Sequence, residues 1–98
     1  MAFDHNGLDE VIHGRMRLGI MAHLAQASPA AFTELAQALE ATNGNLSVHL
    51  AKLEAAGYVA TAKAQKKGRG LTTVALTKAG RSAWADYLGA MRALLERE

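Results

Sequence analysis

The chain has 98 residues, half of them apolar, and its 11 basic and nine acidic side chains leave a net charge of +2. It contains no cysteine, which excludes disulfides, thiolate chemistry and cysteine-ligated zinc. No apolar run approaches the roughly 20 residues that span a membrane, and Met1 to His5 lack the basic and apolar regions of a secretory signal. We therefore predict one cytoplasmic domain over residues 1–98, without membrane contact.

The first predicted helix covers residues 8–25. Its apolar residues, placed at about 100° per residue, wrap most of the helix instead of forming one stripe. A helix that is apolar on several sides is buried on several sides. In so short a chain we expect one of these sides to meet a second subunit, through Leu8, Val11 and Ile12.

Two shorter helices are predicted next. Residues 30–32 are expected to form a very short strand, and residues 34–40 a helix with Thr33 as its N-cap. Residues 43–56 are predicted as a third helix, with Thr42 as its N-cap.

The third helix has two chemically different faces. Leu46, Leu50 and Leu53 are spaced i, i+4 and i+7, which places them on one inward face. The opposite face is small and polar, and it consists of Gly44, Asn45, Ser47, Val48, Ala51 and Lys52. Gly57 is predicted to end the helix in the left-handed conformation.

A hairpin and a last helix complete the predicted elements. Residues 59–64 and 72–76 are β-prone, and the basic turn over residues 65–70 contains glycines that permit positive φ. Thr77 is predicted to cap a helix over residues 78–97. Its apolar stripe has a 3.6-residue period and is expected at a dimer interface: Trp84, Tyr87, Leu88, Met91, Leu94 and Leu95.

Charge is strongly separated along the chain. The stretch from Thr42 to Ser82 holds seven bases and the single acid Glu54, a charge of +6, while the remaining residues hold four bases and eight acids, a charge of −4. A polyanion is therefore attracted to one part of the protein and repelled by the other, and nucleic acid is the obvious polyanion.

The run from Leu46 to Val59 resembles the recognition helix and wing entry of winged helix-turn-helix transcriptional regulators of the MarR/ArsR-like kind. Their pattern is a Ser, then His-Leu, then Leu-Glu, then Gly and an apolar pair. The similarity extends over almost the whole chain and is greatest to a compact subgroup without a separate ligand domain. Further matching segments are Val11 to His13, Arg15 to Leu18, Phe32 to Leu35, Asn43 to Ser47 and Leu76 to Arg81.

The resemblance implies an α+β, mainly α, winged helix with added N- and C-terminal dimerisation helices. It implies a homodimer on double-stranded DNA, with the third helices in successive major grooves and the wings along the flanking backbone or minor groove. Asn45 and Ser47 can bond base edges or phosphates, and Val48 can touch a thymine methyl. Arg69 is the best candidate for a narrow minor groove. The predicted contacts are Thr42, Asn43, Gly44, Asn45, Ser47, Val48, His49 and Lys52 on the helix, and Lys63, Lys66, Lys67 and Arg69 on the wing.

Other interpretations of these residues stay open. The basic turn can be a solvated hairpin tip, and His49 either packs between helices or contacts phosphate. His5, His13, His23 and His49 contain no i, i+4 pair, so we predict no metal site. Without a phosphate loop or a nucleophile elbow we predict neither a cofactor nor an enzyme. A small-molecule effector, if one binds, is expected between the first and last helices.

The sequence thus predicts a homodimeric repressor that binds a pseudo-palindromic duplex site. The alternative is a winged-helix module that binds protein or RNA without operator binding, because fold alone does not fix function.

Overall fold

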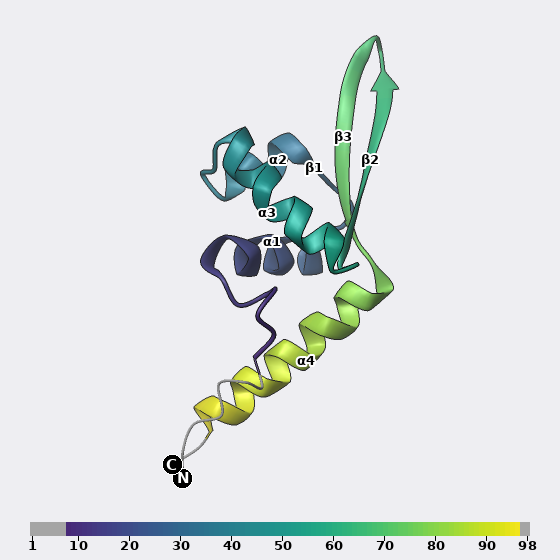
Figure 1. Ribbon diagram of the computed structural model, residues 1–98. Coiled ribbons are helices and arrows are strands. Elements are labelled where there is room, and N and C mark those ends of the chain that lie inside the picture. Colours follow the sequence, from purple (N-terminus) through teal and green to yellow (C-terminus); the bar gives the residue numbers. More distant parts are fainter. Residues whose placement is uncertain (1–7, 97–98) are drawn as a thin grey trace.

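The computed structural model describes residues 8–96, and Figure 1 shows how its helices and strands are arranged. The elements are α1 (Arg15–Gln26), β1 (Ala30–Ala31), α2 (Phe32–Ala38), α3 (Asn43–Ala55), β2 (Val59–Lys66), β3 (Arg69–Leu76) and α4 (Lys78–Leu95). This order is that of an α+β winged helix, so this part of the predicted fold class is confirmed, whereas the dimerisation role of the terminal helices stays a prediction.

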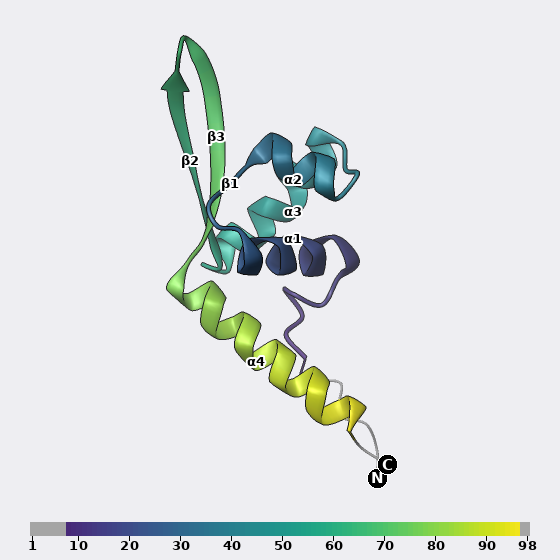
Figure 2. The ribbon, with the colours of Figure 1, turned by 180° about the vertical axis from the view of Figure 1, so that it is seen from behind.

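The three strands form one antiparallel sheet with β3 in the centre. β1 contributes only two residues and pairs Ala30 with Val74, whereas β2 pairs with β3 along its full length and ends with Lys66 opposite Arg69. Helices α1, α2 and α3 gather beside one half of the hairpin, as Figure 1 shows. The other half of the hairpin projects beyond them, and α4 extends away in the opposite direction (Figures 1 and 2).

The core is built mainly from aliphatic side chains that every element supplies. α3 contributes Leu46, Leu50 and Leu53, the inward face that the sequence predicts. The full set is Leu8, Ile12, Ile20, Met21, Leu24, Ala30, Leu35, Leu46, Leu50, Leu53, Val59, Val74, Leu76 and Tyr87. This single cluster holds the three short helices against the base of the hairpin.

The two projections make the molecule longer than a compact domain of its size. Its radius of gyration is 14.8 Å and its longest dimension is 58 Å, whereas a compact domain of this length has a radius of gyration of about 13 Å. The hairpin and α4 therefore carry surface that the core does not use.

The prediction of a first helix beginning at Leu8 is wrong, because α1 begins at Arg15. Asp9 Oδ1 accepts hydrogen bonds from the backbone N–H groups of Val11 (2.8 Å) and Ile12 (3.4 Å) and so folds a local turn. A short Asp side chain competes with helix in this way, and Gly14 then has extended backbone. The apolar residues that wrap round the predicted helix belong partly to this turn.

The second helix is also shifted from its predicted position. α2 begins at Phe32, and Ala31 is its N-cap without a side-chain hydrogen bond, so Thr33 lies inside the first turn and does not cap it. The reason is that β1 leads directly into the helix, since Ala31 pairs with Thr73 of β3. In contrast, Thr42 accepts a hydrogen bond from the N–H of Asn45 (3.1 Å) and caps α3 as predicted.

The hairpin is longer and its turn tighter than predicted. β2 and β3 extend to Lys66 and Arg69, which leaves only Lys67 and Gly68 in the turn. Their φ values are 53° and 76°, and positive φ at both central residues is the mark of a type I′ hairpin turn. The predicted six-residue turn is wrong because Lys67, a non-glycine residue, adopts the left-handed conformation.

α4 is fixed to the domain at its first turn. Thr77 caps it by accepting a hydrogen bond from the N–H of Gly80 (2.9 Å), and its hydroxyl donates to the carbonyl of Gly57 (2.6 Å). A Cβ at Gly80 would lie 2.1 Å from the carbonyl oxygen of Tyr58, so glycine is required for this close approach. α4 ends at Leu95, and residue 97, to which the predicted helix extends, lies outside the described residues.

The N-terminal residues behind the prediction on a secretory signal also lie outside the described range. Among residues 8–96, no helix has the length and apolar character that crossing a membrane requires.

Candidate nucleic-acid interface

The outer face of α3 is presented to solvent because the opposite face is anchored in the core. Leu46, Leu50 and Leu53 are buried, whereas Ser47, Val48, Ala51 and Lys52 between them are exposed. Val48 is 54% exposed, an unusual position for a β-branched apolar residue. The other exposed residues of the predicted set on this helix and its cap are Thr42, Asn43, Gly44, Asn45, Ser47 and Lys52.

His49 differs from its neighbours because it is half-buried and has a partner on α1. Its Nδ1 lies 3.1 Å from Nη1 of Arg17, and Nε of Arg17 donates to the carbonyl oxygen of Val11 (2.5 Å). Burial and then the positive charges of Arg17 and Lys52 lower the pKa of His49. The ring is therefore neutral near pH 7, and since Arg17 has only donors, Nδ1 accepts and the proton resides on Nε2.

The wing carries its basic residues in two groups. Lys66 and Arg69 are directly opposite each other across the ladder, next to Lys67 in the turn. Like charges in this arrangement destabilise a hairpin, and an anion bound at the tip would relieve the repulsion. Lys63 is separate: since successive residues of a strand point to opposite faces, Lys63 and Lys66 lie on opposite faces of the ribbon.

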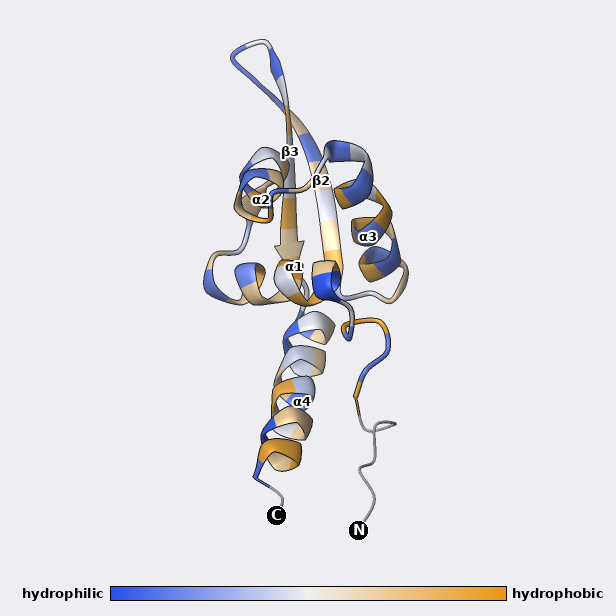
Figure 3. Ribbon diagram, turned by 90° about the vertical axis from the view of Figure 1, so that its left-hand side faces the viewer, coloured by the Kyte–Doolittle hydropathy of each residue, from blue (hydrophilic) through white to orange (hydrophobic). Residues whose placement is uncertain are grey.

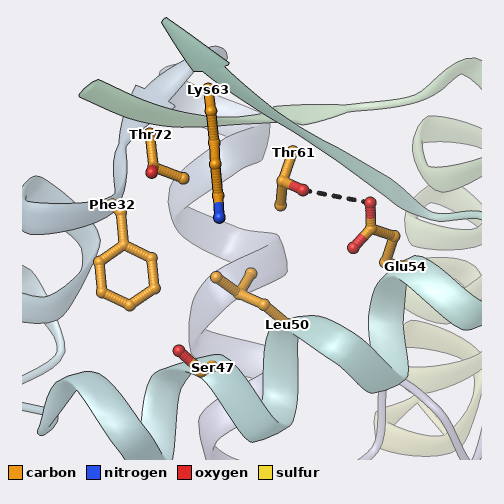
Figure 4. A pocket seen from close by; sticks show the side chains of 7 residues that line it. All are labelled: Phe32, Ser47, Leu50, Glu54, Thr61, Lys63 and Thr72. Atoms are coloured by element: carbon orange, nitrogen blue, oxygen red, sulfur yellow. Dashed lines mark hydrogen bonds between the residues drawn. The ribbon is translucent and has the colours of Figure 1, made fainter. Parts of the chain in front are cut away.

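A groove of about 300 Å³ separates α3 from the wing. Figure 4 shows Lys63 reaching from β2 across this groove towards Ser47 on α3, with Phe32 and Leu50 beside it. The structure thus brings Lys63 close to the outer face of α3, while Lys66, Lys67 and Arg69 lie at the far end of the wing.

The rear of this groove has the opposite charge. Glu54, the single acid of the basic segment, accepts a hydrogen bond from the hydroxyl of Thr61 (3.2 Å), which holds the carboxylate near the wing's base (Figure 4). A polyanion is therefore favoured at the Ser47 end of the groove and disfavoured at the Glu54 end.

Hydropathy also differs between the two ends of the molecule. Figure 3 shows a hydrophilic wing tip at one end and hydrophobic turns of α4 at the other. Leu88 is 40% exposed and Leu95 is 76% exposed, and Trp84, Met91 and Leu94 are half-buried. Tyr87 is instead part of the core, with its ring stacked nearly parallel to that of Trp84 at 5.8 Å.

The comparison with known proteins identifies this architecture. Residues 16–95 match the family model described as a winged helix DNA-binding domain. The chain belongs to this family. It is thus a winged-helix DNA-binding regulator of transcription, and the prediction that it is not an enzyme agrees with this family.

Two of the similar proteins are about as long as this chain, and a third is longer. The chain is 37% identical to the uncharacterized protein MJ0432 of Methanocaldococcus jannaschii over 79 residues. The aligned region covers 81% of this chain and 86% of that protein. It superposes on the transcriptional regulator homologue protein from Pyrococcus horikoshii OT3 with a TM-score of 0.84 at 31% identity, over 90% of this chain and 87% of the other. It also superposes on overoxidized AbfR bound to DNA, with a TM-score of 0.72 at 22% identity, over 83% and 59% of the two chains.

Each histidine within residues 8–96 contacts a different side chain of the same chain. His13 Nδ1 contacts the Tyr87 hydroxyl (2.6 Å), His23 Nε2 contacts Glu34 (2.8 Å) and His49 contacts Arg17. No group of three or more His, Cys, Asp or Glu side chains able to hold a metal occurs in residues 8–96. His5, the remaining histidine of the sequence, lies outside that range.

Sequence reasoning did not single out Arg17 or Asp9. Arg17 is the partner of His49, and Asp9 accepts a hydrogen bond from the Tyr58 hydroxyl (2.5 Å) at the entry to the wing. Their partners are 32 and 49 residues away in the chain, a separation at which periodicity and capping rules carry no signal.

Proposed function

We propose that this winged helix recognises a specific, pseudo-palindromic sequence in duplex DNA as a homodimer and represses transcription there. The observation that carries the proposal is the placement of two different surfaces on one side of the core. The exposed face of α3 supplies donors, acceptors and the apolar Val48, and beside it stands a wing whose tip pairs Lys66 with Arg69.

The outer face of α3 is suited to contact base edges, and the basic residues of the wing are suited to contact phosphates. Base edges in the major groove are read by hydrogen bonds and by contact with thymine methyl groups, for which Asn45, Ser47 and Val48 are suited. Phosphates are neutralised by Lys and Arg without sequence preference, for which Lys63 and the wing tip are suited. A protein of the same fold, AbfR, has been solved bound to DNA.

The homodimer is proposed from α4. Its exposed and half-buried apolar side chains form one helical stripe on a segment that projects from the core, and exposed apolar patches on otherwise polar surfaces mark protein contacts. The proposed interface comprises Val11, Trp84, Leu88, Met91, Leu94 and Leu95. Leu8, Ile12 and Tyr87, which the sequence placed there too, are buried within the single chain and have little surface left for a partner.

Repression is proposed from the length of DNA that a dimer would cover. Two α3 helices in successive major grooves would occupy about one helical turn between their centres, about 34–36 Å. A dimer that covers this length blocks access to the DNA beneath it and needs no additional surface to do so.

A salt titration of duplex binding tests the proposal. With about three to five basic residues of each subunit on phosphates, the slope of log K against log salt is expected between about −5 and −9. Lys66→Ala, Lys67→Ala and Arg69→Ala should each weaken all duplexes similarly and flatten the slope by about one unit for each phosphate that is no longer neutralised. Arg92→Ala on α4 is the matched control and should leave the slope unchanged.

The same titration distinguishes the proposed DNA-binding regulator from the alternative, a winged-helix module that binds protein or RNA. A slope near zero with every duplex would favour a module that binds protein or RNA. Unchanged binding by all three wing variants would show that the basic turn is a solvated tip.

A further inference from the structure

Residues 8–14, here called the strap, precede α1 and bond to side chains from three other parts of the chain. Figures 1 and 2 show this segment running between α4 and α1. Its apolar residues Leu8 and Ile12 are buried in the core, so its path is fixed. The strap precedes the region matched by the family model, which begins at residue 16.

Three polar bonds join the strap to side chains outside it, those of Tyr58, Tyr87 and Arg17. Asp9 Oδ2 accepts from the hydroxyl of Tyr58, which stands where the wing begins. His13 Nδ1 pairs with the hydroxyl of Tyr87 on α4 (2.6 Å). The carbonyl oxygen of Val11 accepts from Arg17, whose guanidinium also contacts His49 on α3. The DNA-facing elements and the projecting helix are thus bonded to one short segment.

α4 has only two buried residues, Gly80 and Tyr87. Gly80 lies against the backbone of Tyr58 and is the first fixed point of the helix. Tyr87 is the second fixed point, and its hydroxyl bonds to the strap. Ala83, Trp84, Ala90 and Met91 pack against the core only in part. The direction of α4 relative to α3 therefore depends most on its buried contact with the wing entry and its buried contact with the strap.

We propose that the strap is a positioning element that sets the angle between α4 and α3 and thereby the half-site spacing that a dimer accepts. Its positioning residues are Asp9 and His13, with Tyr58 and Tyr87 as their partners. This inference rests on the proposed homodimer, in which α4 joins two subunits and each α3 reads one half-site.

The length of α4 amplifies small changes at the strap. Seven residues separate Gly80 from Tyr87 and 15 separate Gly80 from Leu95, distances of about 10 and 22 Å at 1.5 Å per residue. A movement of about 1 Å at Tyr87 therefore becomes about 2 Å at the end of the helix. Adding one base pair between half-sites moves them by about 3.4 Å, so angular freedom of this size changes which spacings are tolerated.

The experiment measures binding to inverted repeats whose spacer differs by one base pair. The half-site is first selected from a random duplex library with the parent protein. Tyr58→Phe/Tyr87→Phe removes both hydroxyls that bond to the strap and keeps both aromatic rings, so the core stays filled. Glu10→Ala, an exposed position within the strap, is the matched control.

The parent and E10A are expected to prefer one spacer over its neighbours by at least about tenfold, and the double variant by about threefold or less. Affinity for a duplex with a single half-site, which a merely destabilised fold would lose, should stay within about twofold. Asp9→Asn, which keeps a hydrogen-bonding group beside Tyr58, should retain the preference that Asp9→Ala loses.

Two results would overturn the inference, and they differ. A double variant that keeps the parent's spacer preference shows that the strap does not set the spacing, while the proposed function stands. A parent that binds single half-sites and inverted repeats of every spacing equally overturns the proposed dimer itself, and with it the role of the strap.

Discussion

The wing and α4 are the two parts of this protein that leave the core, and they differ in what they expose. Of the eight residues of β2 only Val59 is buried, and the exposed remainder consists of lysine, threonine, alanine and glutamine. α4 exposes leucines instead, with Leu88 and Leu95 in contact with solvent. Both projections destabilise a single domain in solution. The wing does so through repulsion between its like charges, and α4 through the exposure of apolar side chains to water.

The difference teaches that the chemistry of a projecting surface indicates its partner better than its exposure does. A surface of like charges is stabilised by a polyanion, whereas an apolar stripe is stabilised by another apolar surface. Substitutions at one end of the molecule, or at the junction between the ends, test whether the two surfaces have these separate roles.

The largest effect is expected at the apolar end. Leu88→Asp/Met91→Asp removes four large apolar side chains from a dimer, each of which stabilises it by about 1.5 kcal/mol or more when buried. Association should weaken by about 6 kcal/mol, about 10⁴-fold, and analytical ultracentrifugation at micromolar concentration should show a monomer.

The control for the dimer variant is Ala93→Asp. Ala93 is exposed and lies on the opposite side of α4 from Leu88, so a dimer should persist. A parent protein that is itself monomeric would contradict the proposed interface.

The junction between α4 and the wing gives the next largest effect. Gly80→Ala places a Cβ about 2.1 Å from the Tyr58 carbonyl oxygen, and since the obstacle is backbone, we expect a loss of about 3 kcal/mol in the free energy of unfolding. Gly89→Ala, on the same helix with nothing within 4 Å of the added Cβ, should stabilise by up to about 1 kcal/mol. Urea unfolding of both variants measures the contrast, and equal effects would contradict it.

At the polar end, base-reading residues should separate from phosphate-binding ones. Asn45→Ala, Ser47→Ala and Val48→Ala should each change which duplex is preferred, by about 1–3 kcal/mol for a true base contact. Quantitative selection of bound sequences measures the change. Alanine variants that weaken all sequences uniformly would show that these side chains contact only the backbone.

The smallest effect concerns the bond between the strap and the wing entry. The hydrogen bond to Asp9, followed by burial, raises the pKa of Tyr58 from 10.0 to about 12. The unfolded chain loses this proton near pH 10 while the folded protein keeps it, so the stabilisation is complete below pH 10 and is lost as the pH rises towards 12.

Tyr58→Phe should therefore flatten the alkaline fall of the free energy of unfolding between pH 10 and 12, measured by urea titration at each pH. Glu10→Ala is the control and should reproduce the parent's curve. If the free energy of unfolding of Tyr58→Phe falls as steeply as that of the parent between pH 10 and 12, the hydrogen bond from Tyr58 to Asp9 does not cause the pH dependence.

Features of this fold that depend on near neighbours were predictable from the sequence. The caps at Thr42 and Thr77 each need one hydroxyl and an N–H three residues on. Gly57 has a φ of 83° because a left-handed residue ends α3 before the strand. The buried face of α3 follows from leucine spacing alone.

The features that sequence reasoning missed depend on competition or on distance. Asp9 can begin a helix or fold a turn on itself, and its additional bond to Tyr58, 49 residues away, favours the turn. The pairing of His13 with Tyr87 spans 74 residues. The turn at Lys67 was missed because its left-handed φ is imposed by strand pairing and not by the residue type.

The free outer half of the hairpin has one more consequence. Between Lys63 and Thr72 the two strands bond to each other and to no helix, so this stretch is nearly independent of the core that folds the domain. Exposed tips of this kind accept changes in length and sequence. The tip is therefore an exchangeable segment: we expect that replacing it with the tip of another regulator changes the affinity for duplex DNA and its salt dependence, while the fold and the sequence preference proposed for α3 stay the same.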